Sequence, residues 1–388
     1  MTSFDPAAAG CRVCGADRKR TLLTVEAVPV NSSALHHSAA EAVGAPQGRL
    51  ELTLCEACGY VRNRAFDPAV LAYEADYDNA LDFSPKFRQY LAALAEELVD
   101  RYGLAGRDVV EIGCGQGRFL AELCRDGRNR AVGFDPTFRP GDEELPPTVT
   151  VVPSLFDPAT DATPADLFCA RHVLEHLDDP LGFLRDLRPA VASRGAALYL
   201  EVPAGEAVFA GDGCWDLPYQ HVSFFSAPTL VALLGRAGYA VTDVRHRFGD
   251  QYLSVEARAE GADPVPAPDL DGFLARAREG ARSLHDRLQR ARELVEVETG
   301  AGRPVALWGA GAKAVTFLSL LGTPISAAVD LNPRKQGTYL PGCGLRVRAP
   351  GDLAEVRPAT VFVFNPMYRD EIASSLADLR VDAEVVLA

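Results

Sequence analysis

The chain has 388 residues, more than one hydrophobic core usually organises, so we expect two or three domains. Its 48% hydrophobic and 24% charged residues exclude extended disorder. A formal net charge of -14 disfavours binding to a nucleic-acid backbone. The first residues lack the basic flank and apolar stretch of a signal peptide, and apolar runs are too short to span a bilayer. We therefore expect a cytoplasmic protein that binds neither nucleic acid nor membranes.

Four of the nine cysteines form two Cys-x-x-Cys pairs, Cys11 with Cys14 and Cys55 with Cys58. Each pair turns two thiolates toward one ion, and two pairs close a tetrahedral shell that leaves no position for water. The pattern predicts a structural Zn²⁺ site in a module over residues 1–70, with unrelated thiols or a redox pair as the alternatives. Between the pairs, the alternating segment 49–54 predicts a strand that leads into the second pair.

A glycine-rich turn follows a short apolar segment, Asp108–Ile112, that predicts a buried strand. The turn has glycines at three alternate positions: Gly113, Gly115 and Gly117. Glycines allow the backbone to approach a ligand where a side chain would clash. A dinucleotide-binding loop would have its third glycine at 118, where this chain has arginine. The spacing therefore favours S-adenosylmethionine (SAM) over NAD, with Glu111 near the cationic end of the ligand.

Two acids follow the next predicted strands. Asp135 ends the segment 131–135, eighteen residues beyond Gly117, where a carboxylate would accept hydrogen bonds from both ribose hydroxyls. The alternative for Asp135 is a helix cap or turn acid. Asp157 is expected near the end of a third strand, close to the adenine.

Strands and helices continue to alternate through residues 197–202, which predicts a mainly parallel, doubly wound α/β sheet. In such folds the binding crevice lies at the carboxyl ends of the strands. Arg171, His172, Glu175 and His176 follow one such end and are candidate site residues. On a helix, the two histidines would lie one turn apart, and one could simply pack.

The segment 215–225 is rich in aromatic and polar residues and fits neither the helical nor the strand period. Such segments commonly cover a crevice. His221 is its strongest candidate general base, because imidazole titrates near neutral pH. Tyr219 could hold a substrate oxygen, and Trp215 is a candidate substrate contact. The alternative is a structural loop with a capped histidine.

A proline-rich linker at 263–268 and a long charged helix over 270–298 precede a second strand-and-glycine-turn unit, residues 304–313. A strand that ends in Asp330 follows, so this unit looks like a reduced copy of the first. Lys313, beside the glycine turn, would suit a phosphate or pyrophosphate. A degenerate unit without a ligand is the alternative.

The order of these parts resembles the sugar C-methyltransferases of antibiotic deoxysugar pathways. The similarity rests on the cysteine module, the glycine turn, the Tyr-x-His-x-Ser-Phe-Phe segment at 219–225 and the later Gly-x-Gly-x-Lys turn at 309–313. It implies a zinc module over 1–70, a class I methyltransferase Rossmann-like domain over 71–262 and a linker helix with a C-terminal Rossmann-like domain over 263–388. It also implies that SAM lies over the glycine turn and that a sugar nucleotide lies between the middle and C-terminal domains.

The resemblance further implies a mechanism in which His221 removes the proton alpha to a ketone, Tyr219 or a neighbour polarises the ketone oxygen, and Tyr77 closes the site. The family usually has glutamate where this chain has Gln220, which places the proton transfer more heavily on His221. A SAM-dependent O- or N-methyltransferase of another natural product, or a non-catalytic SAM- and zinc-binding interaction protein, remains an alternative. We expect a monomer or homodimer.

Overall fold

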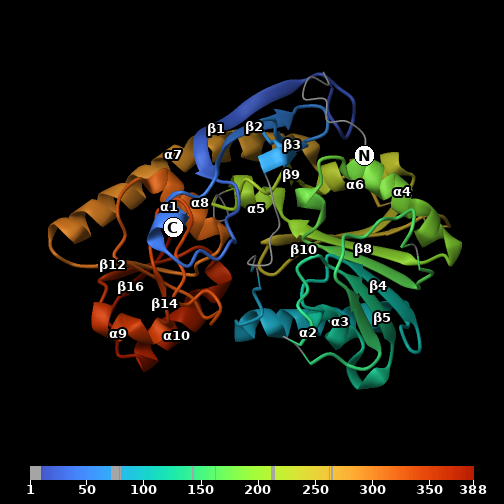
Figure 1. The fold of residues 1–388 in the computed structure, drawn as a ribbon. Coiled ribbons are helices and arrows are strands. Elements are labelled where there is room, and N and C mark those ends of the chain that lie inside the picture. The colour runs from blue at the N-terminus through green and yellow to red at the C-terminus, as the bar shows by residue number, and fades with distance from the viewer. Residues whose placement is uncertain are drawn as a thin grey trace.

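The computed structural model describes residues 10–70, 78, 80–141, 144–161, 163–210, 215–261, 263 and 265–388. Two α/β units lie below an N-terminal sheet and the long helix α7 (Leu270–Gly300), which cross the top of the molecule in Figure 1. Within the described ranges, no helix is both long and apolar enough to cross a membrane. The chain is an α/β protein with Rossmann-like units, as the alternation of elements predicted.

The larger unit is built on a sheet that contains, among the described residues, seven strands. In sheet order they are β10 (Ala240–Arg247), β11 (Tyr252–Arg258), β8 (Ala197–Pro203), β7 (Leu167–Arg171), β4 (Asp108–Ile112), β5 (Arg130–Phe134) and β6 (Val149–Val152). The strands β8 to β6 are parallel, whereas β11 is antiparallel to both of its neighbours. This arrangement places the carboxyl ends of the five parallel strands along one edge.

Helices cover both faces of this sheet: α2 (Pro85–Tyr102) and α3 (Arg118–Leu123) on one face, α4 (Pro180–Ser193) and α6 (Ala227–Ala237) on the other. Adjacent residues of β7 separate into these two cores, because side chains alternate along a strand. Phe168 packs with α4 and α6, and Cys169 packs with α2 and α3. Helix α2 begins with Ser84 as its N-cap and proline in its first turn.

The N-terminal sheet contains β1 (Lys19–Pro29), β2 (Gln47–Cys55), β3 (Val61–Asn63) and β9 (Ser223–Phe224). Its last strand comes from the loop that carries His221, since Val61 pairs with Phe224 and Arg62 with Ser223. The short helix α1 (Ala39–Val43) follows β1 and touches the C-terminal unit, where the Gly342 N–H donates to the Ala42 carbonyl. The N-terminal module therefore contacts both α/β units.

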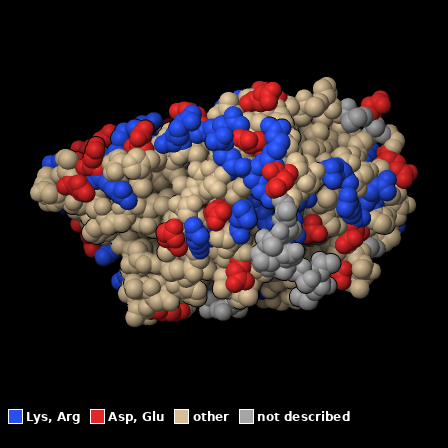
Figure 2. Space-filling view, turned by 90° about the horizontal axis from the view of Figure 1, so that it is seen from above, with Lys and Arg blue, Asp and Glu red and all other residues tan. Residues whose placement is uncertain are grey.

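Helix α7 packs beneath this sheet, and its apolar residues are buried there, including Phe273, Leu288 and Val295. It crosses α5 (Gly205–Ala210) so closely that a Cβ on Gly280 would overlap the Phe209 carbonyl. On the face drawn in Figure 2, basic and acidic side chains lie side by side rather than in one single-sign patch. Oppositely charged side chains also pair between β1 and α7, where Glu56 accepts from Arg20 and Arg278 at 2.9 and 2.8 Å.

The C-terminal unit is a parallel sheet in the order β14 (Val347–Arg348), β13 (Ala327–Val329), β12 (Val305–Trp308), β15 (Thr360–Val363) and β16 (Glu384–Leu387). Its helices are α8 (Ala312–Leu321), α9 (Leu353–Val356) and α10 (Arg369–Asp378). Single 3-10 turns complete the chain: η1 (Pro68–Val70), η2 (Arg125–Gly127), η3 (Leu174–His176), η4 (Pro350–Asp352) and η5 (Pro366–Tyr368). The second Rossmann-like unit predicted from its glycine turn is present.

The third parallel strand is shorter than expected. Strand β6 ends at Val152, because Pro153 cannot donate to the sheet ladder. Asp157 lies five residues later on the surface, where its carboxylate accepts the N–H of Ala159 at 2.9 Å. The expectation that Asp157 ends this strand is therefore wrong, and its side chain caps a turn instead.

Candidate active site

The four cysteines of the N-terminal module come together as predicted. Their sulfur atoms all lie within 4.8 Å of one another, with Cys11 and Cys58, and likewise Cys14 and Cys55, 3.6 Å apart. Each pair turns at a glycine with positive φ, Gly15 at +76° and Gly59 at +78°. Four sulfur donors at one point match the donor set of a structural zinc site.

The glycine turn after β4 forms a cradle at the carboxyl edge of the large sheet. All three of its glycines have positive φ: Gly113 at +71°, Gly115 at +55° and Gly117 at +82°. A Cβ on Gly113 would overlap the Val173 side chain, so only glycine allows the turn to approach the loop that follows β7. Gly117 is the N-cap of α3, whose first N–H groups lie beyond it.

Asp135 stands at the carboxyl end of β5, beside this turn. One carboxylate oxygen accepts the Gly115 N–H at 2.8 Å, and the other accepts from the backbone and hydroxyl of Thr137 at 2.8 and 2.6 Å. The side chain is only partly buried and keeps further lone pairs for a ligand. Asp135 is thus both a turn acid and a fitting ribose acceptor.

Glu111 lies under the turn and is 1% exposed. Burial, opposed by the Arg171 guanidinium, raises the pKa of Glu111 to about 7. Its Oε2 is buried and finds no hydrogen-bond partner in the described part of the chain. An unsatisfied buried carboxyl oxygen next to a glycine cradle fits a cationic ligand group.

Arg171, a predicted cofactor contact, is buried at the carboxyl end of β7. Its guanidinium donates to Glu201 at 2.9 Å and stacks on the Phe119 ring at 4.5 Å, and the side chain is 8% exposed. Arg171 therefore belongs to the buried support of the site, rather than opening toward a ligand as expected for a cofactor contact.

Glu201, on β8, was not identified from the sequence. It is fully buried and accepts from Arg171, from Tyr199 at 3.0 Å and from Tyr90 of α2. Burial opposes its ionisation, but Arg171 and His172 outweigh that cost and hold the pKa of Glu201 well below its usual value. The only sequence signal was an acid inside an otherwise apolar strand, a place where charge is costly unless paired.

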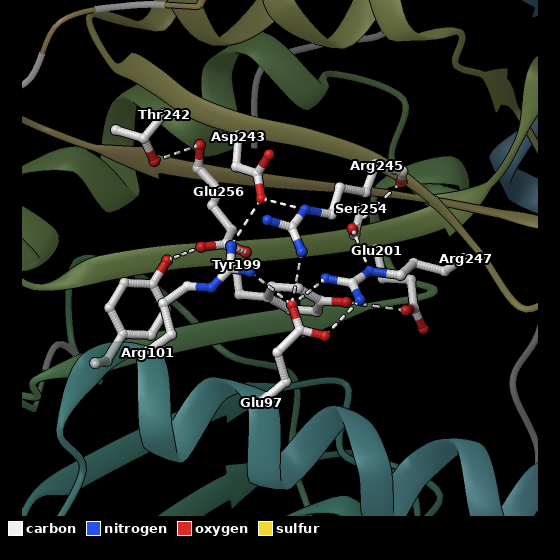
Figure 3. A network of polar contacts seen from close by, with 11 residues as sticks. Glu97, Arg101, Tyr199, Glu201, Thr242, Asp243, Arg245, Arg247, Ser254 and Glu256 are labelled. Atoms are coloured by element: carbon white, nitrogen blue, oxygen red, sulfur yellow. Dashed lines mark hydrogen bonds and ion pairs between the residues drawn. The ribbon is translucent and has the colours of Figure 1, made fainter.

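A second ionic network holds α2 against the sheet (Figure 3). Glu97 accepts two hydrogen bonds from Arg247 at 2.6 and 2.9 Å. Arg101 donates to Asp243 at 2.7 Å and to Glu256 at 2.6 Å. These contacts fix the helix that presents Tyr90 to Glu201.

The loop after β7 carries both candidate histidines of this region. His172 has φ +56°, a left-handed conformation that costs energy for a residue with a Cβ. Its ring lies 3.6 Å from Glu175 and 3.3 Å from Glu201. Burial disfavours its charge, but these two carboxylates outweigh that effect and raise the pKa of His172 to about 9.

His176 and His221 face each other at a ring distance of 5.0 Å. Ligand-type atoms of these two histidines and Glu175 all lie within 4.8 Å of one another. Burial lowers the pKa of His176 to about 4, so its imidazole is neutral. Its Nδ1 lies 3.0 Å from the Gln220 carbonyl, which can only accept, so Nδ1 carries the proton and Nε2 remains an acceptor.

Trp215, Tyr219 and Gln220, three predicted site residues of the 215–225 segment, are buried away from the cluster of Glu175, His176 and His221. Trp215 is fully buried against Phe317, 4.9 Å between rings, so the expectation that it lies open to substrate is corrected. Tyr219 is 1% exposed, and its hydroxyl accepts the Asp67 N–H at 2.8 Å. Its side chain thus packs into the N-terminal module, and the expected contact with a substrate oxygen is corrected as well.

Gln220 is 2% exposed and ties the same loop to the N-terminal module. Its amide oxygen accepts from the Ser32 hydroxyl at 2.7 Å, and its amide nitrogen donates to Asn31 at 3.2 Å. The side chain is therefore a structural clamp, and only its backbone carbonyl reaches His176.

Lys313 lies in the first turn of α8, as the second glycine turn predicted. Its ammonium donates to Gln251 at 3.0 Å and lies 3.6 Å from Asp216. A phosphate would have to share this cation with two protein groups. Tyr77, the expected closing aromatic, lies outside the described residues.

A buried acid joins three parts of the molecule near this edge. Asp78 is 4% exposed, accepts from Asn332 at 2.9 Å and pairs with Arg334 at 2.9 Å and Arg139 at 3.7 Å. Its own N–H donates to the Ser33 carbonyl. Asp78 was not predicted from the sequence, because nothing in the residues around Asp78 distinguishes it from a surface acid.

Two family matches cover most of this architecture. Residues 86–244 match the family described as a methyltransferase domain. Residues 272–387 match the family described as a C-methyltransferase C-terminal domain. The first match contains the glycine cradle, Asp135 and His221, and the second contains Lys313. The chain therefore contains a methyltransferase domain followed by a C-methyltransferase C-terminal domain.

The chain is also similar to individual proteins over part of its length. The tRNA U34 carboxymethyltransferase of Alteromonas mediterranea is 27% identical over 177 residues, which cover 39% of this chain and 51% of that protein. The chain thus spans about half the length of this curated relative.

Among solved structures, magnesium protoporphyrin IX methyltransferase from Synechocystis PCC 6803 is 18% identical with a TM-score of 0.34, over 45% of this chain and 84% of that one. The N,N-8-amino-8-demethyl-D-riboflavin dimethyltransferase from Streptomyces davawensis is 24% identical with a TM-score of 0.36, over 45% and 55%.

Proposed function

We propose that the chain is a SAM-dependent methyltransferase that adds a methyl group to the carbon alpha to a ketone in a nucleotide-linked deoxysugar. The observation that carries the proposal is the close contact of Val173 with Gly113. Val173 belongs to the loop after β7, so this one loop connects the glycine cradle to the cluster of Glu175, His176 and His221. The match of residues 272–387 to a C-methyltransferase C-terminal domain supports carbon as the acceptor atom.

The residues around the cradle fit SAM. Gly113, Gly115 and Gly117 would allow its close approach, Asp135 would accept from the ribose hydroxyls, and Glu111 would face its cationic groups. Bound SAM supplies an electrophilic methyl group on a sulfonium.

His221 is the proposed general base. Its imidazole accepts the proton of the carbon beside the ketone, and the electron pair of that C–H bond becomes the enolate. The enolate carbon forms the new carbon–carbon bond as the methyl–sulfur bond breaks, and S-adenosylhomocysteine leaves. The proton on His221 passes to solvent, which restores the base. Neutral His176 supports this role, because it adds no positive charge beside His221.

We also propose that the four cysteines bind one structural Zn²⁺. The donor set is complete without water, and the site lies in the module that clamps the His221 loop through Gln220. Its role would be to hold that module, not to take part in the reaction.

A thermal-shift panel tests the acceptor class. With S-adenosylhomocysteine present throughout, dTDP, UDP, GDP and CDP are added separately. A ligand at about a hundred times its Kd stabilises the fold by roughly 2.7 kcal/mol. A shift with one diphosphate supports a sugar nucleotide, whereas no shift with any of them argues against it.

Product analysis tests the reaction. The proposal expects a carbon-linked methyl group in the product and exchange of the alpha proton for solvent deuterium before the methyl group is transferred. The His221→Asn variant should lose both the methylation and the deuterium exchange. A methyl group on oxygen or nitrogen would instead establish the alternative methyltransferase.

A further inference from the structure

The loop that carries His221 also carries a carboxylate aimed at its ring. His221 Nδ1 lies 3.7 Å from Asp216 Oδ1. The Nδ1 atom is buried, and among the described residues no group forms a hydrogen bond with it. A buried ring nitrogen without a partner is costly, and a small rotation of Asp216 would satisfy it.

The other oxygen of Asp216 faces the C-terminal unit. Asp216 Oδ2 lies 3.6 Å from Lys313 Nζ, and Lys313 donates to Gln251 at 3.0 Å. Lys313 is in the first turn of α8, and Gln251 directly precedes β11. A chain of charged and polar groups therefore runs from His221 through Asp216 to the second α/β unit.

We infer that Asp216 is a positioning residue that orients the His221 imidazole and stabilises its protonated form, and that Lys313 weakens this effect by competing for the same carboxylate. The inference rests on the proposed role of His221 as the base.

The other groups that face His221 do not serve this purpose as well. His176 is neutral and carries no negative charge. Glu175 is within 4.8 Å of the cluster. Its Oε1 lies 3.6 Å from His172, and its Oε2 is buried without a hydrogen-bond partner among the described residues. Phe224 of β9 contributes only its ring, 6.1 Å from that of His221. Asp216 is distinguished from Glu175 by its position, because it lies on the same loop as His221 and its Oδ1 approaches the buried Nδ1 to 3.7 Å.

Histidine-selective NMR on the full chain with S-adenosylhomocysteine tests the coupling without any acceptor. The His221 signal is assigned by its loss in His221→Asn. Asp216→Asn should lower the midpoint of the His221 titration by about 1 pH unit. Lys313→Met should raise it, because the carboxylate is then free to face the ring. In the double variant, Lys313→Met should add little to the effect of Asp216→Asn.

Asp286→Asn is the matched control, because Asp286 is exposed on α7 and the substitution makes the same change in charge. It should leave the His221 midpoint unchanged. A general loss of folding would move both variants alike, whereas the inference requires opposite shifts from Asp216→Asn and Lys313→Met.

Kinetics with the sugar nucleotide selected by the thermal-shift panel give the second readout. Asp216→Asn should lower kcat about 10- to 100-fold, leave KM within about twofold, and move the acidic limb of the pH profile to lower pH. Equal midpoints in Asp216→Asn and the unaltered chain would overturn the inference. Shifted midpoints together with full activity of His221→Asn would instead overturn His221 as the base.

Discussion

Arg171, the last residue of β7, lies opposite Glu201 of the neighbouring parallel strand β8, and the two form a buried ion pair, with Nη2 and Oε1 2.9 Å apart. The pair lies directly behind the loop that holds His172, Glu175 and His176. One ion pair thus links β7 to β8 at the edge of the sheet where the candidate site lies.

Removing one member of this pair should be costly. Glu201→Gln leaves the Arg171 charge buried without its main partner, and we expect a loss of about 3–5 kcal/mol in the free energy of unfolding. Urea denaturation measures it. Glu279→Gln is the matched control, because Glu279 is 69% exposed and pairs only on the surface with Arg282. We expect less than about 1 kcal/mol there, and equal losses would contradict the argument.

The charge of His172 should make stability depend on pH. Its pKa is raised to about 9 from 6.5, so its contribution is complete below pH 6.5 and is lost as the pH rises through 9. His172→Gln should therefore destabilise the protein at pH 6 by about 1–3 kcal/mol, and the difference should shrink by pH 10. A difference that does not change with pH would show that the imidazolium contributes nothing.

SAM binding should strengthen as Glu111 ionises. The pKa of Glu111 is about 7, so its carboxyl is mostly neutral at pH 6 and mostly charged at pH 8, where it attracts a cationic ligand. Calorimetry should show tighter SAM binding at pH 8. Glu111→Gln should weaken binding about tenfold at pH 8 and much less at pH 6. Identical pH dependence in both proteins would remove Glu111 from the SAM site.

Substitutions at two glycines with the same φ distinguish the effect of backbone strain from that of steric overlap. Gly113 and Gly106 both have φ +71°, but only at Gly113 would a Cβ meet another side chain, that of Val173. Gly113→Ala should weaken S-adenosylhomocysteine binding at least about tenfold. Gly106→Ala should cost only about 1 kcal/mol of stability and leave the affinity unchanged. Equal affinities in the two variants would place the ligand away from this turn.

The cysteine site should bind metal. We expect about one zinc ion per chain by elemental analysis, and its loss in Cys55→Ser. Chelation should lower the melting temperature, because metal binding energy contributes to folding. Cys124→Ser, at a buried thiol outside the cluster, is the control and should keep the ion. Full stability after complete metal removal would argue against a structural role.

The sequence was most informative where local chemistry alone determines the structure. The glycine turns require positive φ, the Ser84-Pro85 pair starts a helix, and paired cysteines meet at one point. These features depend on neighbours within a few residues, so one chain suffices to predict them.

The sequence was least informative where a side chain's role depends on distant partners. Tyr219 and Trp215 resembled site residues, but the N-terminal sheet and α8 bury them. Glu201 and Asp216 acquire their roles from residues on other elements, such as Arg171 and Lys313. No local pattern encodes such pairings.

The pairing of β3 with β9 limits how this protein can be shortened. A fragment that begins after the N-terminal module would expose the backbone groups of Ser223 and Phe224 and uncover Tyr219. It would also free Gln220 from Ser32. An unpaired strand next to newly exposed aromatic side chains invites self-association. The methyltransferase domain is therefore not an independent unit, and a shortened or fused protein would need residues 1–70 together with it.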